Sequence, residues 1–127
     1  MSIVGIGTDI VAVARLEVLL QRHRERFLNR CFREGESLRA TTGEGRALAV
    51  SLAGRWAAKE AYLKALGQDV RGIPYRDIEV RRPQGGPPGL ILHGLAERAL
   101  LRCGGPRVFL TISHEREYAV ATVLLDG

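Results

Sequence analysis

One long apolar stretch, from Arg46 to Leu66, constrains the fold of this chain more than any other feature. Alanine and leucine make up much of it and proline is absent, so its helix propensity is high throughout. Gly67 follows directly, and glycine is the residue that most often adopts the left-handed conformation that ends a helix. The sequence therefore predicts a single long helix that ends at Leu66.

Shorter segments on either side alternate between strand and helix patterns. Residues 3–11 are apolar and rich in β-branched side chains, which predicts a buried strand, and apolar residues at helical spacing follow from Val13 to Cys31. The remaining expectations are strands over 77–82, 90–92, 107–113 and 118–125, a short helix over 95–101, a hairpin turn over 114–117, and turns at 33–36, 41–45 and 83–89, with another short helix between the first two. The pattern contains no linker or repeat and predicts one α+β domain spanning residues 1–127.

Cysteine content and hydropathy limit the compartment. Two cysteines, Cys31 and Cys103, are too few for a disulfide framework and form no Cys-x-x-Cys pair, which favours reduced thiols. No apolar run approaches the roughly 20 residues that cross a membrane. The N-terminus carries no positively charged leader, and Asp9 interrupts its apolar run. We therefore expect a cytoplasmic location and no membrane association.

The net charge of +5 is carried almost wholly by arginine, because the only lysines are Lys59 and Lys64. Much of the excess lies between Val13 and Arg33, where six arginines stand against two glutamates. A basic surface of this kind can bind nucleic acid, an anionic membrane or an acidic protein. The seven aromatic residues are not interleaved with the arginines, and no nucleic-acid-binding motif is present. The sequence therefore favours an acidic protein partner over nucleic acid.

Trp56, Glu60 and Lys64 recur every fourth residue, which places them on one face of the long helix. A Glu–Lys pair at this spacing is commonly a solvated salt bridge of about 0.2–0.5 kcal/mol. However, both lysines of the chain fall within this short stretch, although every other cation is an arginine. A compact ammonium at one of them would suit a point charge for a phosphate or a proton carrier.

Asp9 lies inside the apolar run of residues 3–11, where an ionised carboxylate needs a partner, a hydrogen bond or a cation. Two interpretations stay open from the strand alone: a cap for the following helix, or a functional carboxylate. The Gly-Ile-Gly before Asp9 does not extend to a dinucleotide fingerprint, because Ile10 occupies the third glycine position. Together with Glu60, Asp9 could hold Mg²⁺ completed by substrate phosphates and water.

Histidine gives a weaker signal. His114 follows the strand expected over 107–113 and precedes an acidic–basic turn, a position typical of a surface residue. The sequence shows no Ser/His/Asp or Cys/His nucleophile arrangement and no zinc-ligand spacing. A zinc site or a nucleophilic triad is therefore not expected.

Four segments, in order along the chain, resemble the holo-(acyl-carrier-protein) synthases, the short type of 4′-phosphopantetheinyl transferase. They are Gly5-Ile6-Gly7-Thr8-Asp9-Ile10-Val11, Ala53-Gly54-Arg55-Trp56-Ala57-Ala58-Lys59-Glu60-Ala61 with Lys64-Ala65-Leu66-Gly67, Asp77-Ile78-Glu79-Val80, and Ile112-Ser113-His114 with Glu117-Tyr118-Ala119. Each motif alone is weak, but four collinear motifs over essentially the whole chain are specific.

The resemblance implies a fold in which an antiparallel sheet packs against a long central helix. It implies transfer of the 4′-phosphopantetheine arm of coenzyme A to a serine of apo acyl carrier protein, with release of adenosine 3′,5′-bisphosphate. The carrier protein would serve fatty-acid or polyketide synthesis. The resemblance further implies Mg²⁺ as cofactor and a homotrimer whose active sites lie between protomers.

Individual residues acquire roles from the same resemblance. Asp9 and Glu60 match the family's metal-binding carboxylates, and the candidate base for the serine proton is Glu60 or a metal-bound water. Lys64 matches the lysine near the diphosphate. His114 matches a histidine of the coenzyme A site, and Arg55 is expected to contact a phosphate in the same pocket.

Two turns and one helix complete the expected binding surface. Gly67 and Pro87 are expected to contact coenzyme A, but the family's Gly-Thr-Gly reads Gly67-Gln68-Asp69 here. The turn Gly85-Gly86-Pro87 corresponds to a Gly-Lys/Arg-Pro turn that reaches the neighbouring protomer's nucleotide, and Gly86 lacks the usual positive charge. The basic residues expected to dock the acidic carrier protein are Arg15, Arg22 and Arg26.

The positive residues fall into two groups, for which we expect different binding partners. The arginine excess gathers where a carrier protein would dock, while Lys59 and Lys64 are both expected beside Glu60, where a diphosphate would bind. Two other functions stay compatible with the residues. One is a non-catalytic basic module that binds nucleic acid or an acidic protein, and the other is a Mg²⁺-dependent nucleotide hydrolase that uses the same carboxylates.

Overall fold

The computed structural model describes residues 2–36, 45–68, 70–83 and 85–127. Its elements, in chain order, are β1 (Ile3–Ala12), α1 (Val13–Cys31), α3 (Arg46–Leu66), the 3₁₀ turn η1 (Tyr75–Asp77), β2 (Ile78–Arg81), β3 (Gly89–Leu92), α4 (Gly94–Arg102), β4 (Arg107–Glu115) and β5 (Tyr118–Asp126). The short helix expected between the first two turns falls largely on residues 37–44, which lie outside the described residues. The α+β class and the long helix ending at Leu66 are confirmed.

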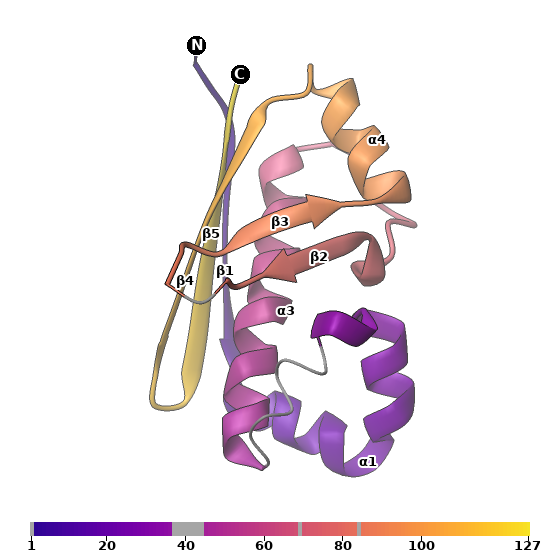
Figure 1. The fold of residues 1–127 in the computed structure, drawn as a ribbon, viewed down its shortest axis with the longest axis vertical. Helices are drawn as coiled ribbons and strands as arrows, with labels where there is room; N and C mark the ends of the chain where they lie inside the picture. The colour runs from indigo at the N-terminus through magenta and orange to yellow at the C-terminus, as the bar shows by residue number, and fades with distance from the viewer. Residues whose placement is uncertain (1, 37–44, 69, 84) are drawn as a thin grey trace.

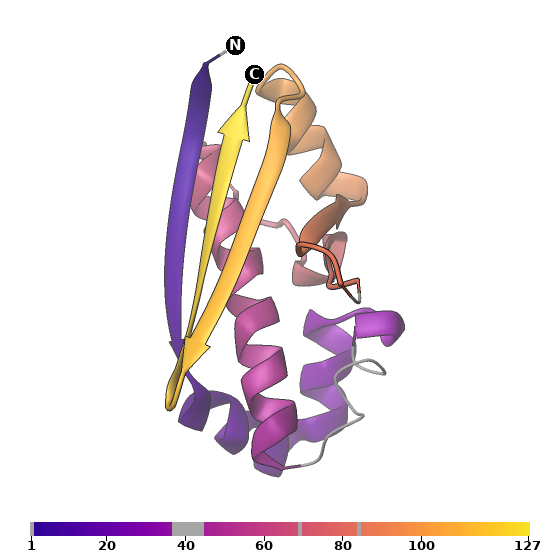
Figure 2. The same ribbon diagram turned by 60° about the vertical axis from the view of Figure 1, so that its left-hand side comes forward.

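The main sheet has three antiparallel strands in the order β1-β5-β4, so the first strand of the chain pairs with the last. Helix α3 lies along one face of this sheet, as Figure 2 shows. Helices α1 and α4 lie on the other side of α3 from this sheet, and the two-stranded sheet β2–β3 crosses in front of α3, with β3 contacting β4 (Figure 1). The predicted architecture, an antiparallel sheet packed against a long central helix, is therefore confirmed.

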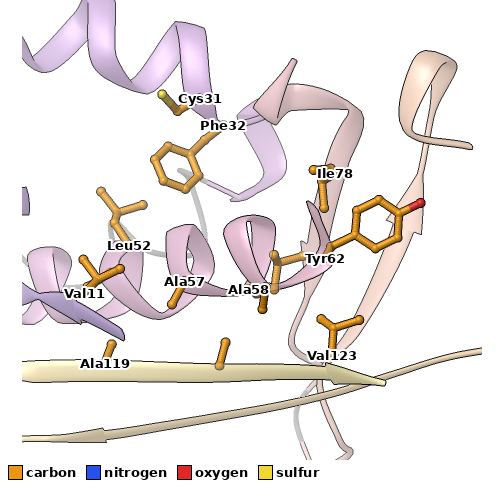
Figure 3. Close-up of a cluster of buried hydrophobic side chains, with 14 of the residues drawn as sticks. Val11, Cys31, Phe32, Leu52, Ala57, Ala58, Tyr62, Ile78, Ala119 and Val123 are labelled. Carbon is orange, nitrogen blue, oxygen red and sulfur yellow. The ribbon is translucent and has the colours of Figure 1, made fainter. Parts of the chain in front are cut away.

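The core surrounds α3. Buried residues occur on all sides of this helix, as expected for a helix enclosed by other elements rather than lying on a surface. Figure 3 shows Phe32 on one side of α3 and Ala119 and Val123 of β5 on the other. The helix is thus the scaffold that positions every residue attached to it.

Glycines allow β1 to approach α3 unusually closely. A Cβ added to Gly7 would lie 2.2 Å from the carbonyl oxygen of Ala61, and one added to Gly5 would lie 2.1 Å from that of Ala65. Real Cβ atoms do not approach backbone oxygens this closely, so no side chain fits at either position. The Gly-Ile-Gly sequence therefore serves strand–helix packing in this fold.

The prediction of a buried strand over residues 3–11 was wrong for one of its faces. Val11 is buried, whereas Ile6 and Ile10 are each 62% exposed. The side chains of a strand alternate between the two faces of its sheet, and only one face packs against α3.

Two local features also differ from expectation. Helix α1 is kinked at His23, which has non-helical torsions (φ −142°, ψ 38°). Strand β4 extends through His114 to Glu115, so the turn to β5 is two residues long and contains Arg116 with a positive φ of 52°. His114 is therefore a strand residue rather than part of the turn.

None of the helices in the described parts of the chain has the length and apolar character that crossing a membrane requires.

Candidate functional site

Asp9 and Lys64 meet where β1 crosses α3. The ammonium of Lys64 donates to Asp9 Oδ1 at 2.9 Å and to the Thr8 carbonyl oxygen at 3.0 Å. The Lys64 side chain is 52% exposed and that of Asp9 is 18% exposed, so both are accessible from solvent. Helix α1 has Ala12 as its N-cap and no side-chain cap, which removes the interpretation of Asp9 as a helix cap. Asp9 is instead a strand residue directed at the helix.

Glu60 lies one turn before Lys64 on α3 and receives two hydrogen bonds on the same oxygen, Oε1. The donors are the Trp56 indole Nε1, at 3.5 Å, and the Tyr75 hydroxyl. Trp56, Glu60 and Lys64 thus share one face of the helix, as their spacing predicted. Burial, together with the hydrogen bond to Glu60, raises the pKa of Tyr75, so its hydroxyl remains a neutral donor.

An aromatic cluster supports this carboxylate. The Trp56 ring lies 5.4 Å from that of Phe27 and 5.9 Å from that of Tyr75. The guanidinium of Arg15 lies over the Trp56 ring, 5.1 Å from its centroid. Arg15, which was expected only on the docking surface of α1, therefore also borders the carboxylate site.

Lys59 does not lie at this site, which corrects the expectation that both lysines flank Glu60 at the diphosphate. Its ammonium is fully buried and donates to Glu36 Oε1 at 3.0 Å and to the carbonyl oxygens of Tyr75 (2.9 Å) and Ile78 (2.6 Å). Burial lowers the pKa of Lys59, and Glu36 opposes that shift. Of the two lysines, only Lys64 belongs to the carboxylate site.

His114 lies apart from the carboxylates within one chain. It pairs with Ala119 of β5, which pairs with Val11 of β1, so two strand spacings (roughly 10 Å) separate it from the strand of Asp9. It lines an open pocket of about 690 Å³ at the β4–β5 hairpin, together with residues 113, 115–118 and 120. The structure thus joins Asp9 to Lys64, places Glu60 one turn before Lys64 on α3, and leaves His114 at a separate pocket.

Comparison with known proteins identifies the family of this chain. A family model described as the 4′-phosphopantetheinyl transferase superfamily matches residues 5–123. The chain belongs to this superfamily. The match spans β1 from Gly5 onward, all of α3 and all of β4, and therefore includes Asp9, Glu60, Lys64 and His114.

Relatives from this superfamily match over nearly the full length. The holo-[acyl-carrier-protein] synthase of Gloeobacter violaceus is 48% identical over 122 residues, covering 96% of this chain and 92% of the relative. That of Halorhodospira halophila is 49% identical and covers 97% of each chain. The crystal structure of a holo-(acyl-carrier-protein) synthase from Bacillus anthracis in complex with CoA (3′,5′-ADP) is 40% identical, with a TM-score of 0.79, covering 98% of this chain and 97% of that chain. The resemblance seen in the four motifs is confirmed.

The other residues expected to bind coenzyme A occupy varied settings within this transferase fold. Arg55 is 4% exposed and donates to Ser51 Oγ at 2.6 Å, so its guanidinium lies inside the fold. Gly67 caps α3 in the left-handed conformation (φ 62°, ψ 19°), as predicted, and its N–H donates to the Lys64 carbonyl at 3.3 Å. Pro87 lies between β2 and β3. Their roles in binding coenzyme A stay predictions, and Asp69 lies outside the described residues.

Two residues of the expected docking surface, Arg22 and Arg26, are exposed on α1.

The sequence did not point to one residue of the carboxylate site, Tyr75. Its contact with Glu60 bridges fifteen residues of sequence, and no periodicity links a 3₁₀ turn to a helix face. Only the fold brings the two together.

Proposed function

We propose that this chain transfers the 4′-phosphopantetheine arm of coenzyme A to a serine hydroxyl of apo acyl carrier protein and releases adenosine 3′,5′-bisphosphate. The observation that carries this proposal is the convergence of Asp9 and Lys64 beside Glu60 at the β1–α3 crossing, in a chain of the 4′-phosphopantetheinyl transferase superfamily. Carboxylates and an ammonium on one accessible surface suit a substrate that carries a diphosphate.

Asp9 and Glu60 are the residues that we assign to hold Mg²⁺. Carboxylate oxygens are the ligands that this ion prefers, and within the described residues no group of three or more His, Cys, Asp or Glu side chains forms a metal cage. Two carboxylates from the protein, with substrate phosphates and water as the remaining ligands, match the way in which proteins usually bind Mg²⁺. When bound, Mg²⁺ would neutralise negative charge that develops on the diphosphate.

Lys64 and Glu60 would divide the remaining work. The half-exposed ammonium of Lys64 can reach a diphosphate oxygen and stabilise the charge of the leaving phosphate. The serine hydroxyl loses a proton during attack on the diphosphate, and its base is either Glu60 or a water molecule that the carboxylates hold. Arg55, Gly67, Pro87 and His114 are proposed to complete the coenzyme A site.

The acidic carrier protein is proposed to dock on α1. Arg22 and Arg26 are exposed there, and Arg15 lies over the Trp56 ring at the edge of the carboxylate site. A carrier protein held by these cations would bring its serine to the carboxylates. The arginine-rich helix therefore connects partner binding with the site of transfer.

We also propose a homotrimer in which the outer face of the main sheet is an interface. Ile6 and Ile10 of β1, Phe109 of β4 and Tyr118 of β5 are each 48–62% exposed. Ile6 and Phe109 both pair with Leu124 of β5, so they lie on one face, and Figure 2 shows no described element over it. An uncovered apolar face of this kind marks an interaction site. A partner chain there would also approach the His114 pocket.

A single assay tests the transfer. The protein is incubated with apo acyl carrier protein, coenzyme A and Mg²⁺, and the carrier protein is weighed by mass spectrometry. The proposal predicts a mass gain of one phosphopantetheine arm that is lost when a chelator is added. Salt-sensitive nucleic-acid binding without that mass gain would instead support a non-catalytic basic module. Hydrolysis of coenzyme A without the mass gain would support a nucleotide hydrolase.

The cysteine content supports a cytoplasmic location, which fractionation of cells would test.

A further inference from the structure

Tyr75 is the residue of the carboxylate site that the helix-face spacing does not account for. It follows Pro74 in the 3₁₀ turn η1 and lies outside α3, yet its hydroxyl donates a hydrogen bond to Glu60 Oε1. The bond joins the turn before β2 to the helix that carries the carboxylate. Its geometry therefore depends on how firmly η1 is held against α3.

Two independent contacts hold Tyr75 in place. Its ring packs against the ring of Trp56, with centroids 5.9 Å apart and an interplanar angle of 57°. Its carbonyl oxygen accepts a hydrogen bond of 2.9 Å from the buried ammonium of Lys59, which Glu36 also binds at 3.0 Å. Lys59 is fully buried, so this anchor is shielded from water. Contacts to the ring and to the backbone of Tyr75 thus fix the position of its hydroxyl.

The two donors to Glu60 converge on one oxygen. The Trp56 indole N–H approaches Oε1 at 3.5 Å, from the same helix, while the Tyr75 hydroxyl approaches it from η1. A carboxylate fixed at one oxygen from two directions loses the freedom to rotate, which orients its second oxygen, Oε2. Groups that orient a metal ligand in this way commonly change metal affinity or activity 10–100-fold when they are removed.

We propose that Tyr75 is a positioning residue whose hydroxyl fixes the rotamer of Glu60, so that Oε2 is ready to bind Mg²⁺. The inference rests on the proposed function, because that function gives Glu60 its metal. Tyr75 acts through Glu60 and touches neither substrate nor metal itself. The aromatic cluster at this site therefore orders the carboxylate as well as stabilising the fold.

Tyr75→Phe tests the role of the hydroxyl, because phenylalanine keeps the ring contact with Trp56 and the backbone bond to Lys59. Trp56 is the only tryptophan of the chain and contacts Glu60, so its fluorescence can report Mg²⁺ titrated into the protein with coenzyme A bound. We expect the apparent Mg²⁺ affinity to fall about 10-fold. The Mg²⁺ concentration for half-maximal transfer should rise in parallel, while the KM for the carrier protein stays within twofold of its original value.

Tyr62→Phe is the matched control. It removes a buried tyrosine hydroxyl from α3, the helix that carries Glu60, but one that donates to the Ala96 carbonyl at 2.7 Å. Its Mg²⁺ affinity should be unchanged even where its melting temperature falls. The inference is overturned if Tyr75→Phe binds Mg²⁺ within twofold of the unaltered protein, or if Tyr62→Phe loses as much affinity. Failure of the proposed function is recognised separately, because unaltered protein would then bind Mg²⁺ without modifying the carrier protein.

Discussion

Replacing Lys59 with methionine should destabilise the protein far more than the same replacement of Lys64. Both lysines lie on α3, and each binds one carboxylate at nearly the same distance, 3.0 Å to Glu36 and 2.9 Å to Asp9. The side chains of the first pair are 1% exposed, whereas Lys64 is 52% exposed. The two ion pairs therefore differ mainly in burial, although Lys59 also donates to two backbone carbonyls and Lys64 to one.

The expected magnitudes follow from that difference. Removing one partner of a buried ion pair costs about 3–5 kcal/mol, because the other charge is left without its counterion. Glu36 would keep two backbone donors, the N–H groups of Arg33 at 2.9 Å and Val80 at 3.0 Å. We therefore expect Lys59→Met to lower the free energy of unfolding by about 3 kcal/mol, or the melting temperature by roughly 10 °C. Lys64→Met should lower it by at most about 1 kcal/mol, because exposed pairs contribute little.

The assay is urea unfolding followed by circular dichroism at one fixed protein concentration, because self-association would make stability depend on concentration. Adding Glu36→Gln to Lys59→Met removes the uncompensated charge and should restore roughly 1–2 kcal/mol. Equal losses of stability for Lys59→Met and Lys64→Met would contradict this prediction, and so would a Lys59→Met loss below about 1 kcal/mol.

Three further predictions concern strand–helix packing, carrier-protein docking and the pH dependence of stability. Gly7→Ala would place a Cβ 2.2 Å from the Ala61 carbonyl oxygen and should cost about 3 kcal/mol or more in urea unfolding, whereas Gly35→Ala, with no atom within 4 Å, should cost less than about 1 kcal/mol. Arg15→Glu should raise the steady-state KM for the carrier protein about 10-fold and leave that for coenzyme A within twofold; equal rises would contradict docking on α1. Burial raises the pKa of Tyr62 above its ordinary 10.0, so the unfolded chain loses this proton first and stability falls as pH rises above about 10. In unfolding experiments above about pH 10, Tyr62→Phe should reduce this loss of stability with rising pH. An unchanged dependence of stability on pH would contradict the prediction.

The long helix and the shared face of Trp56, Glu60 and Lys64 were predictable because they depend on local properties. Helix propensity, the absence of proline and a spacing of four residues act within one segment, and Gly67 marks its end. The four motifs also identified the superfamily. These features needed no knowledge of which segments meet in space.

What the sequence did not predict depends on tertiary contacts. Lys59 and Lys64 look alike in the sequence, but they face opposite surroundings, since one side of α3 packs beneath η1 and β2 while the other meets the edge of β1. Tyr75 reaches Glu60 only through that same packing. The exposure of Ile6 and Ile10 could not be foreseen either, because a strand with two apolar faces reads as buried whether a helix or another chain covers its second face.

The carboxylate site and the transferase function are tested together by comparing the unaltered protein with Asp9→Ala in the transfer of phosphopantetheine to apo acyl carrier protein. Asp9 forms a partly exposed ion pair with Lys64, so the variant should remain folded, with a melting temperature within a few degrees of the original. We expect a mass gain of the carrier protein with the unaltered protein, coenzyme A and Mg²⁺, and none above background with Asp9→Ala. Transfer by Asp9→Ala at the full rate would contradict the carboxylate site, and no transfer by the unaltered protein would contradict the function itself.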